Sequence, residues 1–265
     1  MHRFWEVEES VKTAPWNMNG LHSHTHYEIY YLKKGTREYF FTNTSYHIEA
    51  PCIIIVPPYT MHMTEGGPFE RVNLDVSEDS LNEYQKVILA EKSTKILKPT
   101  EEQAVELEHL FKEMIETDRH GKHADDILDA LFGYTFYVID KIESPNMDSV
   151  SFEKSYIPPL VLKAVNYLNV SYGENHTLDS LSKRFFVSKA TIMYNFNKYL
   201  HCPPMDYLLM LRLSKAKEEL MNTEKSIKEI SESCGFSSPN YFSLIFKRKE
   251  NISPGNYRKY QNTKR

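Results

Sequence analysis

Two segments near the carboxyl end carry side chains that could contact base pairs. Each segment, 188–200 and 238–250, starts with a serine and contains two apolar residues four positions apart, which would face a core in a helix. The outer positions are Ala190, Met193 and Tyr194 in the first segment and Asn240, Tyr241 and Leu244 in the second. An asparagine amide can pair with adenine, and small apolar side chains can pack on thymine methyl groups. These six residues are our candidates for base reading.

Hydroxyls and cations at or beyond the same segments could hold the phosphate backbone. They are Ser188, Lys189, Lys198, Ser238, Lys247, Arg248, Lys249 and Arg258. A basic run is usually only a solvated face. Because most protein–DNA hydrogen bonds go to phosphate and the pattern occurs twice, we predict phosphate contact for these residues.

The elements that must position these side chains are two helix-turn-helix units. Apolar, serine and proline positions recur about fifty residues apart: Leu178, Leu181, Ser188, Phe196, Pro204 and Tyr207 return as Ile227, Ile230, Ser238, Phe246, Pro254 and Tyr257. Ser188 and Ser238 are good helix N-caps, and Pro239 suits a first helical position. Residues 206–221 predict one helix about 24 Å long, a suitable spacer for helices in major grooves about 34 Å apart.

The charge distribution agrees with this division. Residues 156–265 hold 17 Lys and Arg against 9 Asp and Glu, a net charge of +8, whereas residues 1–155 hold 15 against 27, a net charge of −12. The basic half suits double-stranded DNA, and the acidic half would be repelled by it. We therefore expect a different task for the acidic half.

The carboxyl-terminal half resembles the AraC/XylS family of bacterial transcription regulators. The matching residues are Leu178, Leu181, Ser188, Phe196, Pro204, Tyr207, residues 211–221, residues 226–230, Gly235, Phe236, Tyr241, Phe242, Phe246, Ser253, Pro254, Tyr257 and Arg258. The resemblance implies that the two helices bind adjacent major grooves, and it gives RNA polymerase as an expected partner.

The chain departs from the family pattern at four positions. His201 and Asn251 stand where glycine usually follows each reading helix, although asparagine tolerates a left-handed conformation better than histidine does. Tyr194 and Leu244 stand where the family often has arginine. Without those guanidinium groups, paired hydrogen bonds to guanine are not expected, so we predict an A·T-rich site.

The amino-terminal half has the pattern of short strands. Between residues 26 and 76, runs rich in Ile, Val, Tyr and Phe are separated by turn signals, one of them at 33–35, which predicts a sandwich or small barrel. From residue 100 the apolar period becomes helical, and a polar break at 118–126 predicts a helical hairpin. The wide apolar faces of this hairpin favour a homodimer through it; the alternative is that both faces close onto their own barrel.

Four polar residues of this half resemble cupin motifs. His22, His24, Glu28 and Gly35 have the spacing of the first motif, and Pro57 and His62 fit the second in part, with Pro51 and Tyr59 where that motif usually has glycine. In a metal-binding cupin, His22, His24, Glu28 and His62 would converge on one ion. In AraC-like regulators the same positions commonly line an effector pocket without metal.

We therefore predict an effector pocket and no cofactor. Its residues are His22, His24, Glu28, Tyr30 and His62, with the metal site as the alternative. Tyrosine rings on neighbouring strands suit sugars, so a carbohydrate is the predicted small-molecule effector. A regulator needs no metal and no turnover, whereas the competing function, a metal-dependent cupin enzyme with a DNA-binding appendage, needs both. We predict the regulator.

These patterns predict an α+β chain made of a cupin-like β-barrel, a hairpin and an all-α domain. The expected boundaries are 1–99 for effector binding, 100–143 for the hairpin, 144–158 for a linker and 159–265 for DNA binding. The start of the chain lacks the pattern of a signal peptide, and the longest apolar run, 52–56, is too short to span a bilayer. We expect a cytoplasmic protein without a membrane partner, with Cys52, Cys202 and Cys234 buried and reduced.

Overall fold

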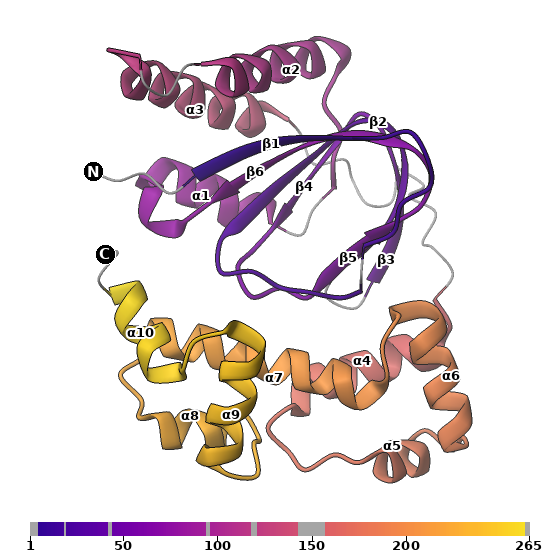
Figure 1. The fold of residues 1–265 in the computed structure, drawn as a ribbon. Helices are drawn as coiled ribbons and strands as arrows, with labels where there is room; N and C mark the ends of the chain where they lie inside the picture. Colours follow the sequence, from indigo (N-terminus) through magenta and orange to yellow (C-terminus); the bar gives the residue numbers. More distant parts are fainter. Residues whose placement is uncertain are drawn as a thin grey trace.

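The computed structural model describes residues 5–18, 20–41, 44–93, 96–117, 121–142 and 157–262. Its strands are β1 (Trp5–Lys12), β2 (Tyr27–Phe41), β3 (Thr44–Glu49), β4 (Cys52–Val56), β5 (His62–Glu65), β6 (Phe69–Val76) and β7 (Ile96–Leu97). Its helices are α1 (Glu83–Lys92), α2 (Glu101–Glu116), α3 (Ala124–Lys141), α4 (Pro159–Ser171), α5 (Leu178–Arg184), α6 (Lys189–Leu200), α7 (Pro204–Asn222), α8 (Ile227–Ser233), α9 (Pro239–Glu250) and α10 (Pro254–Asn262). Figure 1 shows the strands in one half of the molecule, with α2 and α3 above them and α4 to α10 below. The predicted α+β class is confirmed.

The sheet is organised around β2, and its pairs are antiparallel. The first part of β2 pairs with β6 and β4, and its second part pairs with β3 and β5. β1 adds to β6 and β7 adds to β4. One long strand therefore runs through both parts of the curled sheet (Figure 1).

The turn predicted at residues 33–35 is wrong, because β2 continues through it as a bulge. The pairing of β2 with β6 shifts register between Leu32 and Lys34. Gly35 has φ +92°, and a Cβ at this position would lie 2.3 Å from the carbonyl oxygen of Pro68, so only glycine fits. Turns and bulges both select glycine for positive φ, so composition alone does not separate them.

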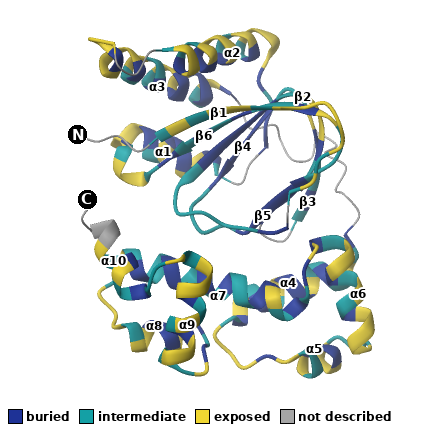
Figure 2. Ribbon diagram, viewed as in Figure 1, coloured by how far each residue is buried: buried dark blue, intermediate teal, exposed yellow. Residues whose placement is uncertain are grey.

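Alternate residues of β2 belong to two different cores. Ile29 and Tyr31 pack with Phe111 of α2 and Phe136 of α3 in a core between the sheet and the helical hairpin. Tyr30 and Leu32 face the barrel interior. Figure 2 shows the strands largely buried, with buried and exposed positions alternating along α2 and α3.

The helical half contains two packed clusters that share α7. Ile192 and Phe196 of α6 lie in the first cluster, with α4 and the start of α7. Phe242 and Phe246 of α9 lie in the second, with α8, α10 and the end of α7. All four side chains are buried, as predicted from their spacing.

The predicted ends of the two reading helices are confirmed. The hydroxyls of Ser188 and Ser238 accept hydrogen bonds from backbone N–H groups in the first turns of α6 and α9, and Pro239 opens α9. His201 and Asn251 follow these helices in the left-handed conformation, with φ +53° and +59°. Histidine therefore adopts here the conformation for which the family usually uses glycine.

The strands β1 and β7 and the helix α1 were not predicted, and one prediction lies mostly outside the described residues. β1 has mixed exposure rather than a strict alternation, and α1 follows a short helical turn at Glu78–Ser80. Residues 143–156, nearly all of the predicted linker, are not among the described ones, so the domain boundaries stay predictions. Cys52, Cys202 and Cys234 are buried thiols. Within the described ranges, no helix has the length and apolar character needed to cross a membrane.

Candidate functional site

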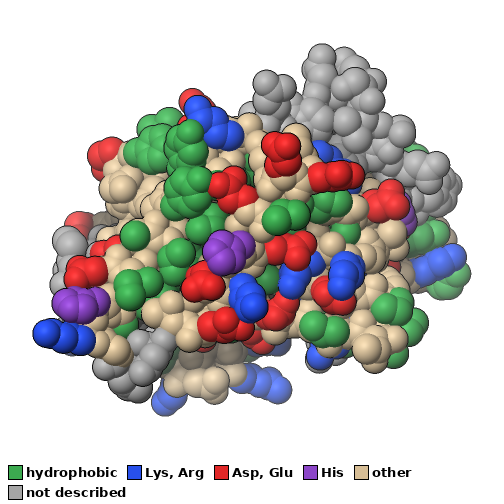
Figure 3. Space-filling model, turned by 90° about the horizontal axis from the view of Figure 1, so that it is seen from above, with side chains coloured by type: hydrophobic (Ala, Val, Ile, Leu, Met, Phe, Trp, Pro, Cys, Tyr) green, Lys and Arg blue, Asp and Glu red, His purple; other side chains and the backbone are tan. Residues whose placement is uncertain are grey.

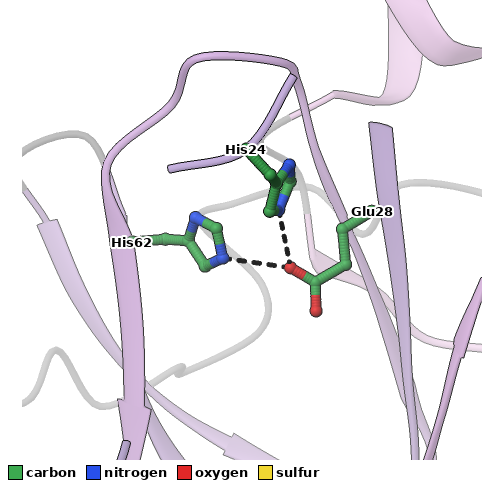
Figure 4. Close-up of side chains that lie close together, drawn as sticks. All are labelled: His24, Glu28 and His62. Atoms are coloured by element: carbon green, nitrogen blue, oxygen red, sulfur yellow. Dashed lines mark hydrogen bonds and ion pairs between the residues drawn. The ribbon is translucent and has the colours of Figure 1, made fainter. Parts of the chain in front are cut away.

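Three of the predicted pocket residues meet inside the barrel. His24 lies just before β2, Glu28 lies in β2, and His62 opens β5. Glu28 Oε2 lies 3.1 Å from His24 Nε2 and 3.0 Å from His62 Nε2. Figure 4 shows the two imidazole rings pointing at the same carboxylate oxygen. Glu28 and His62 are buried, so this cluster is shielded from bulk water.

Backbone carbonyls fix how both rings are oriented. His24 Nδ1 lies 2.8 Å from the carbonyl oxygen of His26, and His62 Nδ1 lies 2.9 Å from that of Thr60. A carbonyl only accepts, so each Nδ1 carries a proton, and a neutral ring then presents its Nε2 lone pair to Glu28. Two lone pairs facing one carboxylate need a proton or another cation between them.

The Glu28 carboxylate is held in its charged form. Burial acts to raise the pKa of Glu28, but hydrogen bonds and charges from His24 and His62 hold that pKa well below its ordinary value. Asn73 Nδ2 donates to the other carboxylate oxygen, Glu28 Oε1, at 2.7 Å. The carboxylate is therefore oriented from both sides.

The three-residue cluster also fits a metal ion. The potential ligand atoms of His24, Glu28 and His62 lie within 4.8 Å of one another. Two imidazoles and a carboxylate suit a divalent transition metal, and histidine ligands usually donate their other N–H to a carbonyl, as these two do. These three side chains are therefore suitable ligands for a metal ion, as the alternative prediction requires.

His22 lies beside this cluster but is not one of the three converging groups. Its ring centroid lies 4.2 Å from that of His62 and 6.1 Å from that of His24. Burial, followed by the charge of His62, lowers the pKa of His22 to about 4, so the ring is neutral near neutral pH. Tyr30, the fifth predicted pocket residue, is buried in the same interior.

Sequence reasoning missed two arginines inside the barrel, Arg37 and Arg71. Arg37 is buried, and the guanidinium groups of both lie over the ring of Phe69. For Arg71 the available signal was the alternation of polar residues along β6, Arg71, Asn73 and Asp75, which places polar side chains on one face of that strand.

A surface cleft of about 400 Å³ lies away from this cluster, between α2 and the outer face of the sheet. Its lining includes Lys33 and Glu9, which form an ion pair of 2.6 Å, and Lys112 and Glu116, which lie 3.9 Å apart. These charges already have partners, so the chemistry of the interior cluster is the better candidate for a ligand site.

The predicted base-reading residues lie on the outer faces of α6 and α9. Tyr194 is 62% exposed and Leu244 is 66% exposed, and Ala190, Asn240 and Tyr241 are also exposed. Met193 is half-buried. The two faces therefore present the side chains singled out from the sequence, although base contact itself stays a prediction.

The phosphate candidates differ in what they already bind. Lys247, Arg248 and Lys249 are exposed in the last turn of α9. Lys189 Nζ forms a 2.8 Å ion pair with Asp179, so it must exchange that partner to reach phosphate. Arg258 donates from Nε to the carbonyl oxygen of Leu220 and from Nη2 to that of Lys225. These bonds give Arg258 a structural role that the sequence did not suggest.

Both halves match known protein families. Residues 10–135 match the family described as AraC-like ligand binding domain, and residues 181–260 match the one described as helix-turn-helix domain. The HTH-type transcriptional regulator YdiP of Escherichia coli K12 is 27% identical over 248 residues, which cover 88% of this chain and 78% of the relative.

Two further relatives match shorter parts. The lactose operon transcription activator of Staphylococcus xylosus is 25% identical over 138 residues, which cover 52% of this chain and 49% of the activator. The DNA-binding domain of the global transcriptional factor AdpA, solved in complex with a target DNA, is 26% identical, with a TM-score of 0.39, over 40% of this chain and 96% of that one.

Proposed function

This chain belongs to the AraC family of transcriptional regulators, and from that membership we propose that a small molecule bound inside its barrel controls how its two helix-turn-helix units engage DNA. The proposal rests on two short stretches of chain that line the barrel site and also contact the helical half. Residues 21–24 and 59–65 supply His22, His24 and His62 to the interior and also contact the helices.

The apolar part of this shared contact is continuous with the core of the first helix-turn-helix unit. Leu21, Met61 and Met63 are buried in one cluster with Val161 of α4 and Phe196 of α6. Each is next in the chain to a histidine of the barrel site. A displacement of either histidine backbone therefore also displaces a side chain in the helical core.

The polar part of the contact reaches α7 and the end of α6. Ser214 of α7 is 1% exposed; it donates to the carbonyl oxygen of Tyr59 at 3.0 Å and accepts from the Ser23 hydroxyl at 2.9 Å. His201, the left-handed residue after α6, pairs through Nε2 with Glu65 at 2.6 Å. Helix α7 and the residue that ends α6 are thus both bonded to the segments of chain that carry the pocket histidines.

Coupling of this kind is reciprocal, so effector and operator must change each other's affinity by the same factor. A genome-wide pull-down of bound DNA would supply the operator, and the genes beside it would indicate the effector. Operator titrations with and without that compound then test the proposal. A carbohydrate effector is supported by the similarity to a lactose operon activator. Identical operator affinity with and without every compound that binds the barrel would contradict effector control.

On the DNA side we propose an A·T-rich operator read by Asn240, Leu244 and the outer face of α6. Affinity should fall steeply as salt rises, because several cations neutralise phosphates. Contact with RNA polymerase also stays a prediction. Preference for a G·C-rich operator in a binding-site selection would contradict this reading of the two helices.

We also propose a homodimer through the helical hairpin. Much of the apolar surface that suggested it packs on the chain's own barrel, since Phe111 and Phe136 belong to the outer core. Figure 3 shows what is left above α2 and α3: hydrophobic side chains interleaved with acidic and basic ones. The exposed apolar residues there include Val105, Ile127 and Tyr137. Light scattering that shows only monomers at micromolar concentration, with and without DNA, would contradict the dimer.

A second candidate function, a metal-dependent cupin enzyme, is favoured by the three converging groups of His24, Glu28 and His62. A metal ion held by these side chains would polarise an oxygen atom of a substrate. We propose the metal-free regulator, so purified protein should contain less than one equivalent of metal. Elemental analysis of protein made without a metal-binding tag tests this. A full equivalent that is lost in His24→Ala and His62→Ala, together with turnover of a small molecule, would favour the enzyme.

A further inference from the structure

The barrel interior contains a guanidinium group with no anionic partner. Arg71 of β6 forms no ion pair and donates no hydrogen bond to any described residue, and its Nε and Nη1 atoms are buried. Its Cζ lies 5.2 Å from the ring centroid of Tyr30, 5.6 Å from that of Phe69 and 5.8 Å from that of Trp16. Aromatic faces attract a cation, but they do not satisfy its N–H groups.

The second interior arginine increases this excess of positive charge. Arg37 is 1% exposed, and its N–H groups are bonded to the Thr64 hydroxyl and to the carbonyl oxygens of Gly67 and Trp16. None of these acceptors carries a charge. Burial and the charge of Arg71 lower the pKa of Arg37, against opposing contributions from Tyr30 and from the Glu65 carboxylate. Arg37 is buried and Arg71 is half-buried, and neither forms an ion pair with a described acidic residue. Burying an unpaired cation is costly, and a bound anion would reduce that cost.

Other unpaired polar atoms lie beside Arg71 and continue toward the histidine cluster. The hydroxyls of Tyr30 and Tyr39, both fully buried, form no hydrogen bond of normal geometry, and neither does Asn73 Oδ1, although the Tyr30 hydroxyl lies near Thr64 and Arg37. Tyr30 is directly opposite Asn73 in the β2–β6 pair. The ring centroids of Tyr30 and Tyr39 lie 5.1 Å apart, and Tyr39 lies 6.3 Å from His62. Buried polar groups are normally paired, so such a row indicates a place for a polar ligand.

We infer that the barrel binds a small hydroxylated organic anion, a carboxylate or phosphate ester, with its charged group on Arg71 and its hydroxyls on Tyr30, Tyr39 and Asn73. The inference rests on the proposed effector function and narrows the predicted carbohydrate to a charged derivative. Arg71 supplies the charge recognition, because a guanidinium group binds both carboxylate and phosphate oxygens. The tyrosines and Asn73 supply the match to hydroxyl groups.

The test uses the full chain and three probes that differ in charge. Glucose is neutral, glucuronate adds a carboxylate, and a hexose phosphate adds a phosphate; inorganic phosphate serves as the minimal anion. At constant ionic strength, we expect a saturable rise in melting temperature with at least one anion and none with glucose. Comparison of glucuronate with the hexose phosphate shows which anionic group the site prefers.

Two variants separate the site from general charge effects. Arg71→Met removes the charge but keeps an unbranched side chain, and it should weaken anion binding by roughly ten- to a hundredfold. Lys34→Met removes one charge from the outside of the same sheet, where the Lys34 side chain is 70% exposed, and should leave binding unchanged. Circular dichroism confirms that both variants are folded.

Three outcomes would overturn the inference: equal anion shifts in wild type and Arg71→Met, an equal shift with glucose, or no saturable shift with any anion at millimolar concentration. Operator titrations in the same buffers keep this result separate from the proposed function. Anion binding that requires Arg71 but leaves operator affinity unchanged supports the site and refutes effector control. An operator response to a neutral compound that survives Arg71→Met supports effector control and refutes the anion site.

Discussion

The barrel interior and the helical half differ in how their buried polar side chains are paired. In the helical half the Tyr207 hydroxyl donates to Asn169 Oδ1 at 2.8 Å, and Arg212 Nε donates to the carbonyl oxygen of Tyr172 at 2.8 Å. In the barrel, Tyr30, Tyr39 and Arg71 each have a buried polar atom without a partner. Among the described residues, the unpaired atoms of the helical half are confined to the hydroxyls of Ser231 and Tyr257.

The difference indicates which half is complete without a ligand. Paired polar groups and filled aromatic clusters make the helical half a scaffold that holds α6 and α9 in fixed places. Unpaired groups in the barrel lower its stability in the free state, and a bound molecule could form hydrogen bonds with them. Variants in the two halves should therefore have different signatures, and the following four experiments test that difference.

The largest effect is expected in the packed core of the helical half. Phe196→Ala removes a buried ring from the first helix-turn-helix unit and should lower the free energy of unfolding by about 3–5 kcal/mol. Tyr194→Ala, on the exposed face of the same helix, should change it by less than about 0.5 kcal/mol. Urea unfolding measures both. Similar losses in the two variants would mean that α6 is not packed as described.

Asn240→Ala should act on DNA recognition and not on folding. If its exposed amide pairs with a base, the loss is about 1–3 kcal/mol on the specific operator and little on random DNA. Fluorescence anisotropy with both duplexes measures the two values. Equal losses on the two duplexes would show that Asn240 only positions the DNA backbone.

His24→Ala and His62→Ala should remove the response to effector and leave folding and basal operator binding nearly intact. The lost quantity is the coupling free energy, typically about 1–3 kcal/mol. His47→Ala is the control, because His47 lies on β3 and pairs with Glu38, away from the described cluster. Operator titrations with and without effector decide the matter, and an intact response in both cluster variants would place the effector elsewhere.

A matched pair of hydroxyl deletions gives the smallest and sharpest comparison. Tyr207→Phe removes the hydroxyl that donates to Asn169 Oδ1 and should cost about 1–2 kcal/mol of stability. Tyr39→Phe removes a buried hydroxyl that has no partner, so its effect should be near zero or slightly stabilising in the free protein. Thermal unfolding in the absence of added anions measures both. A larger loss for Tyr39→Phe would remove the distinction between the two halves.

The features that could be predicted from the sequence are mostly those whose signals lie in residues close together in the chain. The caps at Ser188 and Ser238 and the buried pairs of α6 and α9 depend on residues three or four positions apart, and the structure confirms them. The family resemblance placed His24, Glu28 and His62 together, although their convergence requires the sheet to curl so that the bridge between His22 and His62 lies beside the start of β2. These features were therefore available before the fold was known.

The features that were missed depend on closure of the barrel and on contact between the halves. The bulge at Gly35 redirects β2, and that path determines which side chains meet Arg71 inside. Ser214 occupies an ordinary position in an amphipathic helix, and nothing near it in the chain signals its bond to Tyr59. Such contacts join residues far apart in sequence, so no local pattern records them.

The sharing of α7 between the two helical clusters has a consequence for the operator. This helix has 19 residues, is about 28 Å long, and packs with α6 in one cluster and with α9 in the other, so it fixes how these two helices are separated. Inserting one base pair between the two recognition boxes would rotate one box by roughly 35° about the DNA axis, since a turn holds about 10–10.5 base pairs. The protein could match that rotation only by disrupting one of the two helical clusters. The spacing between the two boxes of its operator should therefore be fixed, and the promoters that it controls should have the same number of base pairs between their boxes.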